Sequence, residues 1–440
     1  MSTPRTAGQL LRSRGYLAAL AVSGLLGVPV ALLAYGFLQL ASYAQRWVFE
    51  ELPSALGLGS EPVWWPVPMV TVGGLVVGLV VRHLPGDGGE SGVDGVRAGG
   101  PPAARHLPGI ALAALGTLAF GAVLGPEAPL IALGGGLAAL AVRALRRDAP
   151  EQAVALIGAA GSFAAISTLL GSPLLGAFLL LEVAGAAGTA AGRTSVLLVP
   201  GLLASGLGAL IFLGLDSVTG LAKPSLVVPD LPPVRELTLA QFGWAIVIGV
   251  AAALLGTALR RLARPVARWT RHHVVVATAV AGLKVGLLAC LYALLTSKGT
   301  RDVLFSGQEA LGPLLAHGAE YSAGSLLLLL GCKGLAYGVS LGAFRGGPVF
   351  PAMFLGAVGG LALSHLPGLD AVPAAAMGIG ALCVTMLGLP LVSVLLATLL
   401  LLSSGLATMP LVIVSVVVAY VLRAWLSPAT DDPAADTPRP

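Results

Sequence analysis

Apolar segments follow one another along nearly the whole chain, and several are shorter than the roughly 20 residues that an upright helix needs to cross a bilayer. Only 10% of the 440 residues are charged and 56% are hydrophobic. In a soluble globular protein about 25% of residues are charged, so the sequence predicts an all-α protein that crosses a membrane many times. The apolar segments lie near residues 16–44, 64–83, 107–124, 129–145, 152–170, 173–184, 194–214, 238–262, 273–296, 322–341, 349–365, 371–388, 391–403 and 409–426.

Glycine and proline interrupt these segments in both halves of the chain. The 60 glycines and 31 prolines are spread through apolar sequence instead of being gathered in a linker. Short, interrupted segments in corresponding places are typical of transporters built as inverted repeats, with a binding site near the middle of the bilayer. The proline-rich stretch 217–239 is a natural junction between halves at about 16–216 and 238–427.

Positive charge lies beside the apolar segments. The net charge of +5 is concentrated in arginine clusters, as expected for cytoplasmic loops, and it indicates topology rather than nucleic-acid binding. The first apolar segment is too long for a signal peptide, so we expect residues 1–15 to be a cytoplasmic segment that precedes the first span. Residues 428–440, rich in Asp, Pro, Ala and Thr, are expected to form a disordered cytoplasmic tail. The clusters are Arg5/Arg12/Arg14, Arg143/Arg146/Arg147 and Arg260/Arg261/Arg264/Arg268/Arg271.

A single carboxylate stands between two prolines in Gly125-Pro126-Glu127-Ala128-Pro129, with apolar sequence on both sides. A carboxylate at membrane depth is costly and indicates a functional site. Proline fits the first turn of a helix, so we expect Glu127 to lie at the N-terminus of a helix that starts near Pro129. The unpaired N–H groups and the positive end of the dipole there favour a negative charge, or a diffusible anion. The alternative is a capping Glu at the membrane surface.

The second half carries a comparable element, Gly346-Gly347-Pro348-Val349-Phe350-Pro351. The glycines allow close backbone approach, and the prolines bracket a helix start whose Val349 and Phe350 N–H groups could face an anion. Taken alone, such a glycine pair is more often a helix-packing feature. Two such elements in different halves favour a shared anion site.

These motifs resemble the CLC family of chloride channels and chloride/proton exchangers. The family's G-[RK]-E-G-P is similar to residues 125–129, and its G-G-x-F-x-P is similar to residues 346–351 with the Phe displaced by one position. Its P-L-x-G segment resembles residues 173–176, and its G-S-G-I-P finds a poorer match in residues 90–94. The resemblance covers about residues 15 to 427 and implies one CLC-like transmembrane domain over 16–427. This domain would be an inverted repeat of tilted and broken helices, without CBS domains.

The resemblance also implies roles for single residues. Glu127 falls on the gating glutamate, whose ionised side chain mimics an anion and moves away when it is protonated or displaced. Val183 falls where exchangers have an inner proton-relaying glutamate, although the adjacent Glu182 makes this alignment open to a one-residue slip. The anion-binding positions implied are Ser91 through its hydroxyl, with Gly125, Ala128, Val349 and Phe350 through the backbone.

The chain also departs from the family pattern. Pro126 and Pro348 remove up to two backbone donors, and Ser403-Ser404-Gly405 stands where the family has its central tyrosine. Both departures predict weaker anion binding. Lys333, inside an apolar segment, either raises the positive potential of the path or pairs with a carboxylate.

The leading hypothesis is therefore permeation of chloride or a similar anion, channel-like or weakly coupled to protons, with a chloride/proton antiporter as the alternative. An intramembrane enzyme is a distant alternative, because the sequence shows no nucleophile–base pair or metal motif at membrane depth. A cation carrier would use Glu90, Asp94, Glu127 and Glu182. We expect no cofactor, no metal and no nucleic-acid partner. The resemblance further implies a homodimer in the cell membrane, the bacterial inner membrane.

Overall fold

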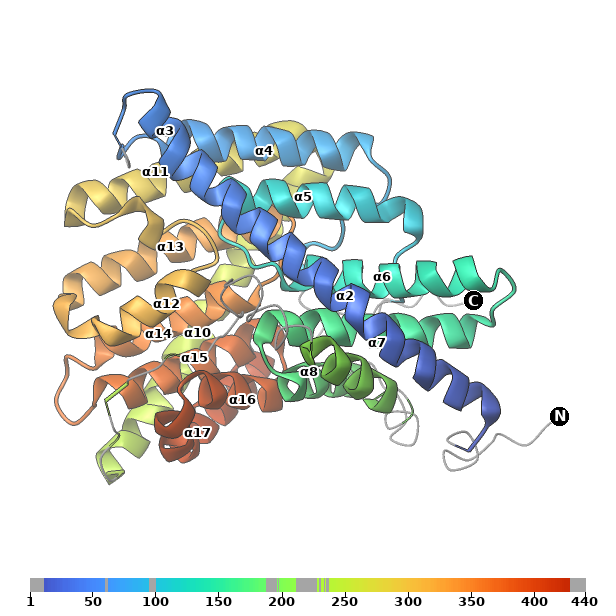
Figure 1. Cartoon of the computed structure of the whole chain (residues 1–440). Helices are drawn as coiled ribbons and strands as arrows, with labels where there is room; N and C mark the ends of the chain where they lie inside the picture. The colour runs from blue at the N-terminus through green and yellow to red at the C-terminus, as the bar shows by residue number, and fades with distance from the viewer. Residues whose placement is uncertain are drawn as a thin grey trace. The chain divides into compact units, whose positions relative to one another are not determined.

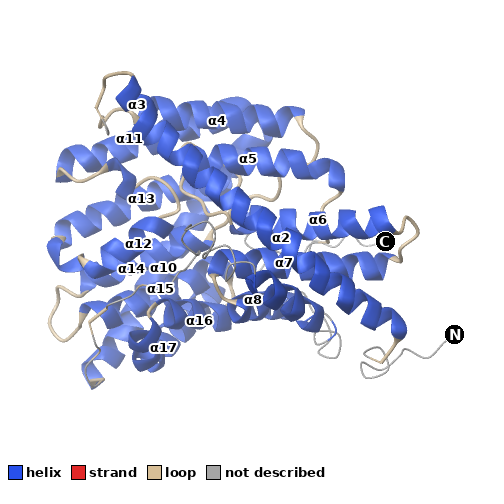
Figure 2. Cartoon of the chain, viewed as in Figure 1, coloured by secondary structure: helices blue, strands red, loops and turns tan. Residues whose placement is uncertain are grey.

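The apolar segments of the sequence form helices in the computed structural model, which describes residues 12–59, 62–94, 100–186, 196, 198–210, 228, 231, 232, 234 and 237–427. Within these residues all regular structure is helical, as Figure 2 shows, so the predicted all-α class is confirmed. Eight of the described helices are long and apolar enough to cross a membrane. The protein is therefore a multi-pass membrane protein.

The helices keep close to the predicted segments (Figure 1). The principal ones are α2 (Arg14–Arg46), α3 (Leu52–Ala55), α4 (Pro66–His83), α5 (Leu107–Ala119), α6 (Glu127–Leu145), α7 (Glu151–Leu170), α8 (Pro173–Ala186), α10 (Leu239–His272), α11 (Val274–Thr296), α12 (Gln308–Ala316), α13 (Ala323–Ala343), α14 (Val349–Leu363), α15 (Ala371–Leu387), α16 (Pro390–Leu400) and α17 (Leu402–Leu426). A further apolar helix covers Leu198–Leu210.

Two helices extend well beyond their predicted segments. Helix α10 continues through the arginine cluster to His272. Arginine, alanine and leucine all have high helix propensity, so the helix does not need to end where the apolar sequence ends. Helix α17 begins at Leu402 and therefore includes Ser403-Ser404-Gly405, with Pro410 in its interior. Hydropathy alone marks where a helix is buried in lipid, not where its hydrogen bonds end.

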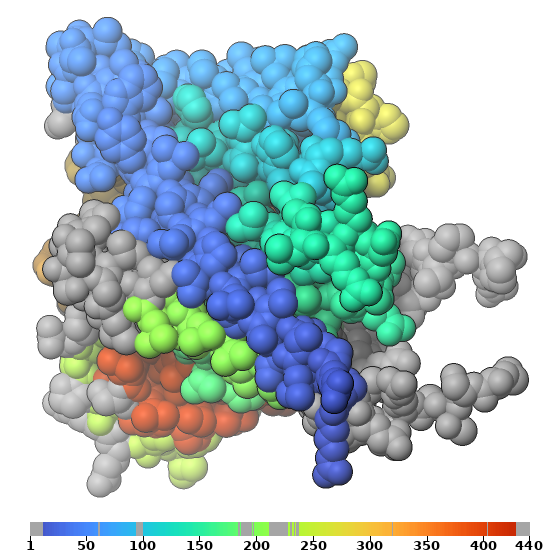
Figure 3. All heavy atoms as spheres, turned by 45° about the vertical axis from the view of Figure 1, so that its right-hand side comes forward, coloured from blue at the N-terminus to red at the C-terminus, as the bar shows by residue number. Residues whose placement is uncertain are grey.

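The chain divides into two compact units that interleave along the sequence. The first comprises residues 1–226, 263–308 and 335–351, and the second comprises residues 227–262, 309–334 and 352–440. In the first unit α2 runs across α5, α6 and α7 (Figure 1) and forms a blue band on the surface in Figure 3. In the second unit α15 packs against α16 and α17.

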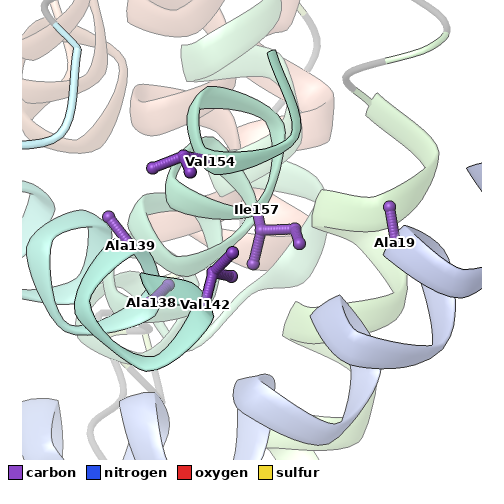
Figure 4. Packing of buried hydrophobic residues seen from close by; sticks show 6 residues of the cluster. All are labelled: Ala19, Ala138, Ala139, Val142, Val154 and Ile157. Atoms are coloured by element: carbon purple, nitrogen blue, oxygen red, sulfur yellow. The ribbon is translucent and has the colours of Figure 1, made fainter. Parts of the chain in front are cut away.

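Small residues let the helices of the first unit pack closely. A Cβ on Gly134 would meet the Gly161 carbonyl at 2.6 Å, and a Cβ on Gly286 would meet the Pro66 carbonyl at 2.8 Å. The α6–α7 and α4–α11 pairs are therefore in backbone contact, as is typical of membrane helices. Beside the α6–α7 contact, a cluster of buried alanine and aliphatic side chains joins both helices to α2 (Figure 4). Its members are Ala19, Ala138, Ala139, Val142, Val154 and Ile157.

The connections between α5 and α6 and between α13 and α14 leave the helical pattern inside buried sequence. Residues 121–126 and 346–350 are all buried, although neither connection has side chains that could satisfy its backbone polar groups unaided. Buried backbone groups need hydrogen-bond partners. Gly125 and Gly347 supply such partners to each other across the two connections, and this pairing lies at the candidate site.

Candidate anion site

The two non-helical connections are joined by a backbone pairing between Gly125 and Gly347. Each residue donates its N–H to the carbonyl of the other, with N···O distances of 2.8 Å from Gly125 and 2.6 Å from Gly347. A Cβ on either glycine would overlap with the Glu127 carboxylate. Only glycine can therefore occupy both positions while the carboxylate lies where it does.

Glu127 is the first residue of α6 and is fully buried. Its Oε1 accepts a hydrogen bond of 2.8 Å from the backbone N–H of Phe350, in the first turn of α14. The N–H groups of Val349 and of Glu127 itself also favour the ionised carboxylate. The carboxylate of Glu127, in the first half of the sequence, thus lies at the N-terminus of α14, in the second half.

Nothing but amide groups balances this negative charge among the described residues. Glu127 forms no ion pair in the described part of the chain, and its Oε2 has no hydrogen-bond partner there. Burial disfavours an ionised carboxylate, whereas the N–H donors and the α14 dipole favour it. The site is consequently one that can hold either a proton on Glu127 or a negative charge.

Several buried groups fix the two connections around this carboxylate. The N–H of Val123 donates to Ser340 Oγ at 3.1 Å, and the hydroxyl of Tyr337 donates to the Pro348 carbonyl at 2.7 Å. The N–H of Phe305 donates to the Gly121 carbonyl at 3.2 Å. The start of α14 and the residues that lead into α6 are therefore held by polar contacts in otherwise apolar surroundings.

Sequence reasoning did not identify Tyr337 or Ser340 as part of the site. Both side chains are fully buried, as is that of Lys333, and the three occur at i, i+4 and i+7 on one face of α13. This spacing of polar residues within an apolar helix was a readable signal. Without the fold, however, it did not show which segment the polar face would meet.

The segment that contains Ser91 lies against the connection before α14. Ser91 Oγ donates to the Leu341 carbonyl at 3.3 Å, and a Cβ on Gly92 would lie 3.2 Å from the Gly346 carbonyl. The hydroxyl is thus engaged with the backbone of α13. The predicted contact of Ser91 with an anion stays a prediction, as do the predicted backbone roles of Gly125 and Ala128. The Gly125 N–H is already used in the pairing with Gly347.

The remaining predicted residues lie elsewhere. Val183 on α8 is buried and Glu182 beside it is half-buried. In the second unit Lys333 is fully buried, and its Nζ lies 4.5 Å from the centroid of the Phe354 ring in a cation–π contact. Ser404, in the segment that replaces the family's tyrosine, donates to the Pro232 carbonyl at 3.3 Å.

In the described ranges no three His, Cys, Asp or Glu side chains are grouped so that they could hold a metal ion. Within the described residues, Cys290, Cys332 and Cys383 form no disulfide.

The sequence and the fold of this chain resemble those of known proteins. Residues 73–424 match the family model described as voltage gated chloride channel. The chain is 29% identical over 376 residues to a protein of Salmonella schwarzengrund provisionally named as the ion-transport protein YfeO, covering 84% of each chain. The same identity and coverage hold for the YfeO protein of Salmonella paratyphi A.

Three solved structures share the fold. The crystal structure of a slow cyanobacterial Cl⁻/H⁺ antiporter gives a TM-score of 0.75 at 19% identity, covering 95% of this chain and 96% of the other. A CLC-type fluoride/proton antiporter gives 0.70 at 18% identity, with 93% and 96% covered. A eukaryotic CLC transporter gives 0.69 at 16% identity, with 96% and 74% covered. These likenesses confirm the predicted architecture of tilted and broken helices.

Proposed function

Since this chain belongs to the voltage gated chloride channel family, we propose that it moves chloride or a similar small anion across the cell membrane through a pore gated by Glu127. The family consists of channels and transporters, which confirms the expectation of a protein that is not an enzyme. CLC-type anion transport is the general activity that membership shows. The gate, the degree of proton coupling and the preferred anion are what we propose.

The observation that carries the gate is the contact between Glu127 and Phe350. A carboxylate that accepts the Phe350 N–H at 2.8 Å fills the position that a permeating anion would take at the start of α14. When the side chain is protonated it loses its attraction to these donors, and when an anion competes for them it is displaced. In either case the N–H groups of Val349 and Phe350 become available to the anion.

The donors around this position suit rapid passage. Amide groups without a fixed positive charge bind an anion weakly, and weak binding lets it leave again. Pro126 and Pro348 contribute no N–H, and Gly125 and Gly347 use theirs on each other. We therefore propose channel-like or weakly coupled transport, with Ser91 and the first-turn amides of α6 and α14 as the anion ligands.

Proton-coupled exchange is the second candidate, and the partnerless Oε2 of Glu127 favours it because a proton can bind there. Two of the structural relatives are described as antiporters. Against tight coupling, Val183 offers no acid at the inner position, although Glu182 is adjacent. In this scheme Lys333 supplies positive potential along the path.

Flux from reconstituted vesicles tests the proposal. Purified protein in vesicles loaded with chloride should release it, and Glu127→Gln should release it faster with a weaker dependence on pH. Glu151→Gln is the matched control, because that exposed glutamate pairs with Arg143 on the surface. Vesicles that hold chloride equally well with and without protein would contradict the proposed function.

We further propose that the protein is a homodimer in the plasma membrane with both termini in the cytoplasm. The arginine-rich ends of α6 and α10 support this orientation. Mass photometry of the detergent-solubilised protein and cysteine labelling near either terminus in intact cells would test the two statements separately.

A further inference from the structure

Arg345 links the three segments that surround the candidate anion site. It lies in the connection between α13 and α14, two residues before Gly347. Its backbone N–H donates to Thr117 Oγ1 near the end of α5 at 3.3 Å. Its side-chain Nε donates to the Asp87 carbonyl at 2.9 Å, in the loop that leads from α4 toward Ser91.

The loop that receives this side chain consists mainly of residues in the left-handed region. Gly86, Asp87, Gly88 and Gly89 all have positive φ angles, of 91°, 51°, 70° and 94°. A Cβ on Gly88 would lie 2.9 Å from the side chains of Ala113 and Val81 and 3.4 Å from Arg345 Cγ, so the loop runs close to the arginine stem. Asp87 adopts a left-handed conformation that is uncommon for a residue other than glycine. Asp87, whose carbonyl accepts the Arg345 Nε–H, is thus the one residue of the four for which this conformation is costly.

The positive charge of Arg345 is not neutralised by a direct ion pair. Its hydrogen bonds go to the carbonyls of Asp87 and Phe344, the latter at 3.4 Å from Nη1. In the described residues it takes part in no ion pair, although the exposed Asp87 carboxylate lies close enough for a weaker electrostatic interaction. A guanidinium has five N–H donors, and two bonds to carbonyls leave donors for an anion.

We propose that Arg345 is the selectivity-determining cation of the anion pathway, with Asp87 as the negative charge that moderates it. The inference rests on the proposed function and adds the residue that makes an amide-lined site prefer anions. Arg345 raises the local anion concentration beside the start of α14, two residues from the Gly125–Gly347 pairing. Asp87 acts in the opposite direction, so the two charges together set the affinity.

A matched set of variants separates this electrostatic role from a purely structural one. Arg345→Gln should weaken chloride binding and lower chloride flux by about five- to tenfold, whereas Arg345→Lys should retain most of both. Asp87→Asn should shift binding the other way and tighten it. All three differences should shrink as an impermeant salt such as potassium gluconate is added, because salt screens exposed charges. Arg146→Gln, at the exposed end of α6, is the control and should change nothing.

The measurements are equilibrium chloride binding by calorimetry in detergent and chloride efflux from vesicles of phosphatidylethanolamine and phosphatidylglycerol. Each variant is first compared with wild type for its elution profile and Tm. If Arg345→Lys is impaired as much as Arg345→Gln and Asp87→Asn has no effect, Arg345 only holds the neighbouring segments together through its hydrogen bonds, and the inference is wrong. If the wild-type protein itself carries no anion, the proposed function fails instead, so the two failures are distinguishable.

Discussion

Phe350 donates its backbone N–H to the carboxylate of Glu127 at 2.8 Å, although the two residues are 223 positions apart in the sequence. Each lies in the first turn of a helix, and the two helices come from opposite halves of the chain. The acidic side chain thus occupies the positive end of a helix dipole that is not its own. The Glu127 carboxylate therefore occupies the position at which we propose that a permeating anion binds.

Replacing Glu127 by glutamine removes the charge that competes with the anion while keeping the size of the side chain. We expect faster chloride efflux than in wild type, because a neutral amide is held less strongly by the Phe350 N–H. Efflux by wild type should rise as the pH falls, since protonation neutralises the carboxylate, and the variant should lose most of this dependence. Efflux traces at acidic and neutral pH check both statements. Equal pH dependence in the two proteins would contradict a gating role.

Gly347→Ala places a methyl group where the Glu127 carboxylate now lies. We expect a loss of about 1–3 kcal/mol in stability, because the added methyl group pushes the carboxylate away from the Phe350 N–H or strains the paired backbone. Gly331→Ala on α13 is the control, since a Cβ there meets nothing within 4 Å. It should be neutral or stabilise by up to about 1 kcal/mol through its higher helix propensity. Thermal unfolding in detergent measures both, and similar Tm values for the two variants would refute the overlap.

Tyr337→Phe removes the hydroxyl that donates to the Pro348 carbonyl. Loss of one buried hydrogen bond should lower stability by about 1 kcal/mol. Because that carbonyl directly precedes Val349, the first turn of α14 should also become less ordered and chloride affinity should fall. Tyr420→Phe, on α17 and 41% exposed, is the matched control and should alter neither quantity. Chloride calorimetry beside thermal unfolding would show whether affinity and stability change together.

Coupling to protons can be measured independently of any variant. With equal chloride on both sides of a vesicle and a pH gradient across it, a channel-like protein should show a reversal potential near zero. An exchanger would develop a potential that follows the pH gradient. A sizeable, stable shift would overturn channel-like permeation and favour the antiporter alternative, in which Glu182 would be the first residue to test as an inner proton relay.

The sequence predicted the helices well because lipid-facing and buried segments are both apolar, and their boundaries fall where glycine, proline or arginine interrupts them. It predicted the start of α6 less accurately. The helix begins at Glu127 rather than near Pro129, because Pro126 takes the N-cap position and Pro129 still lies in the first turn, where its missing N–H costs nothing. The prolines were correctly associated with the helix start, and Glu127 lies at the N-terminus of the helix as predicted.

The site was predictable only in part. Glu127 and the Val349–Phe350 turn each carried a local signal, namely a lone acid between prolines and a glycine pair before a helix. The pairing of Gly125 with Gly347 carried none, because a single bridge between two extended residues has no periodicity along the chain. The same holds for the Arg345 side chain, whose partner in the Asp87 loop is identified only by the fold.

The glycine pairing also limits how the protein can move. In surroundings of low polarity, each of these two amide hydrogen bonds is worth about 4–6 kcal/mol relative to leaving its N–H and carbonyl groups without a partner. A transport cycle that separated the two connections would have to break both hydrogen bonds between Gly125 and Gly347 on every turnover. In the function that we propose, the glycine pairing stays intact and the ion crosses when the Glu127 side chain moves aside.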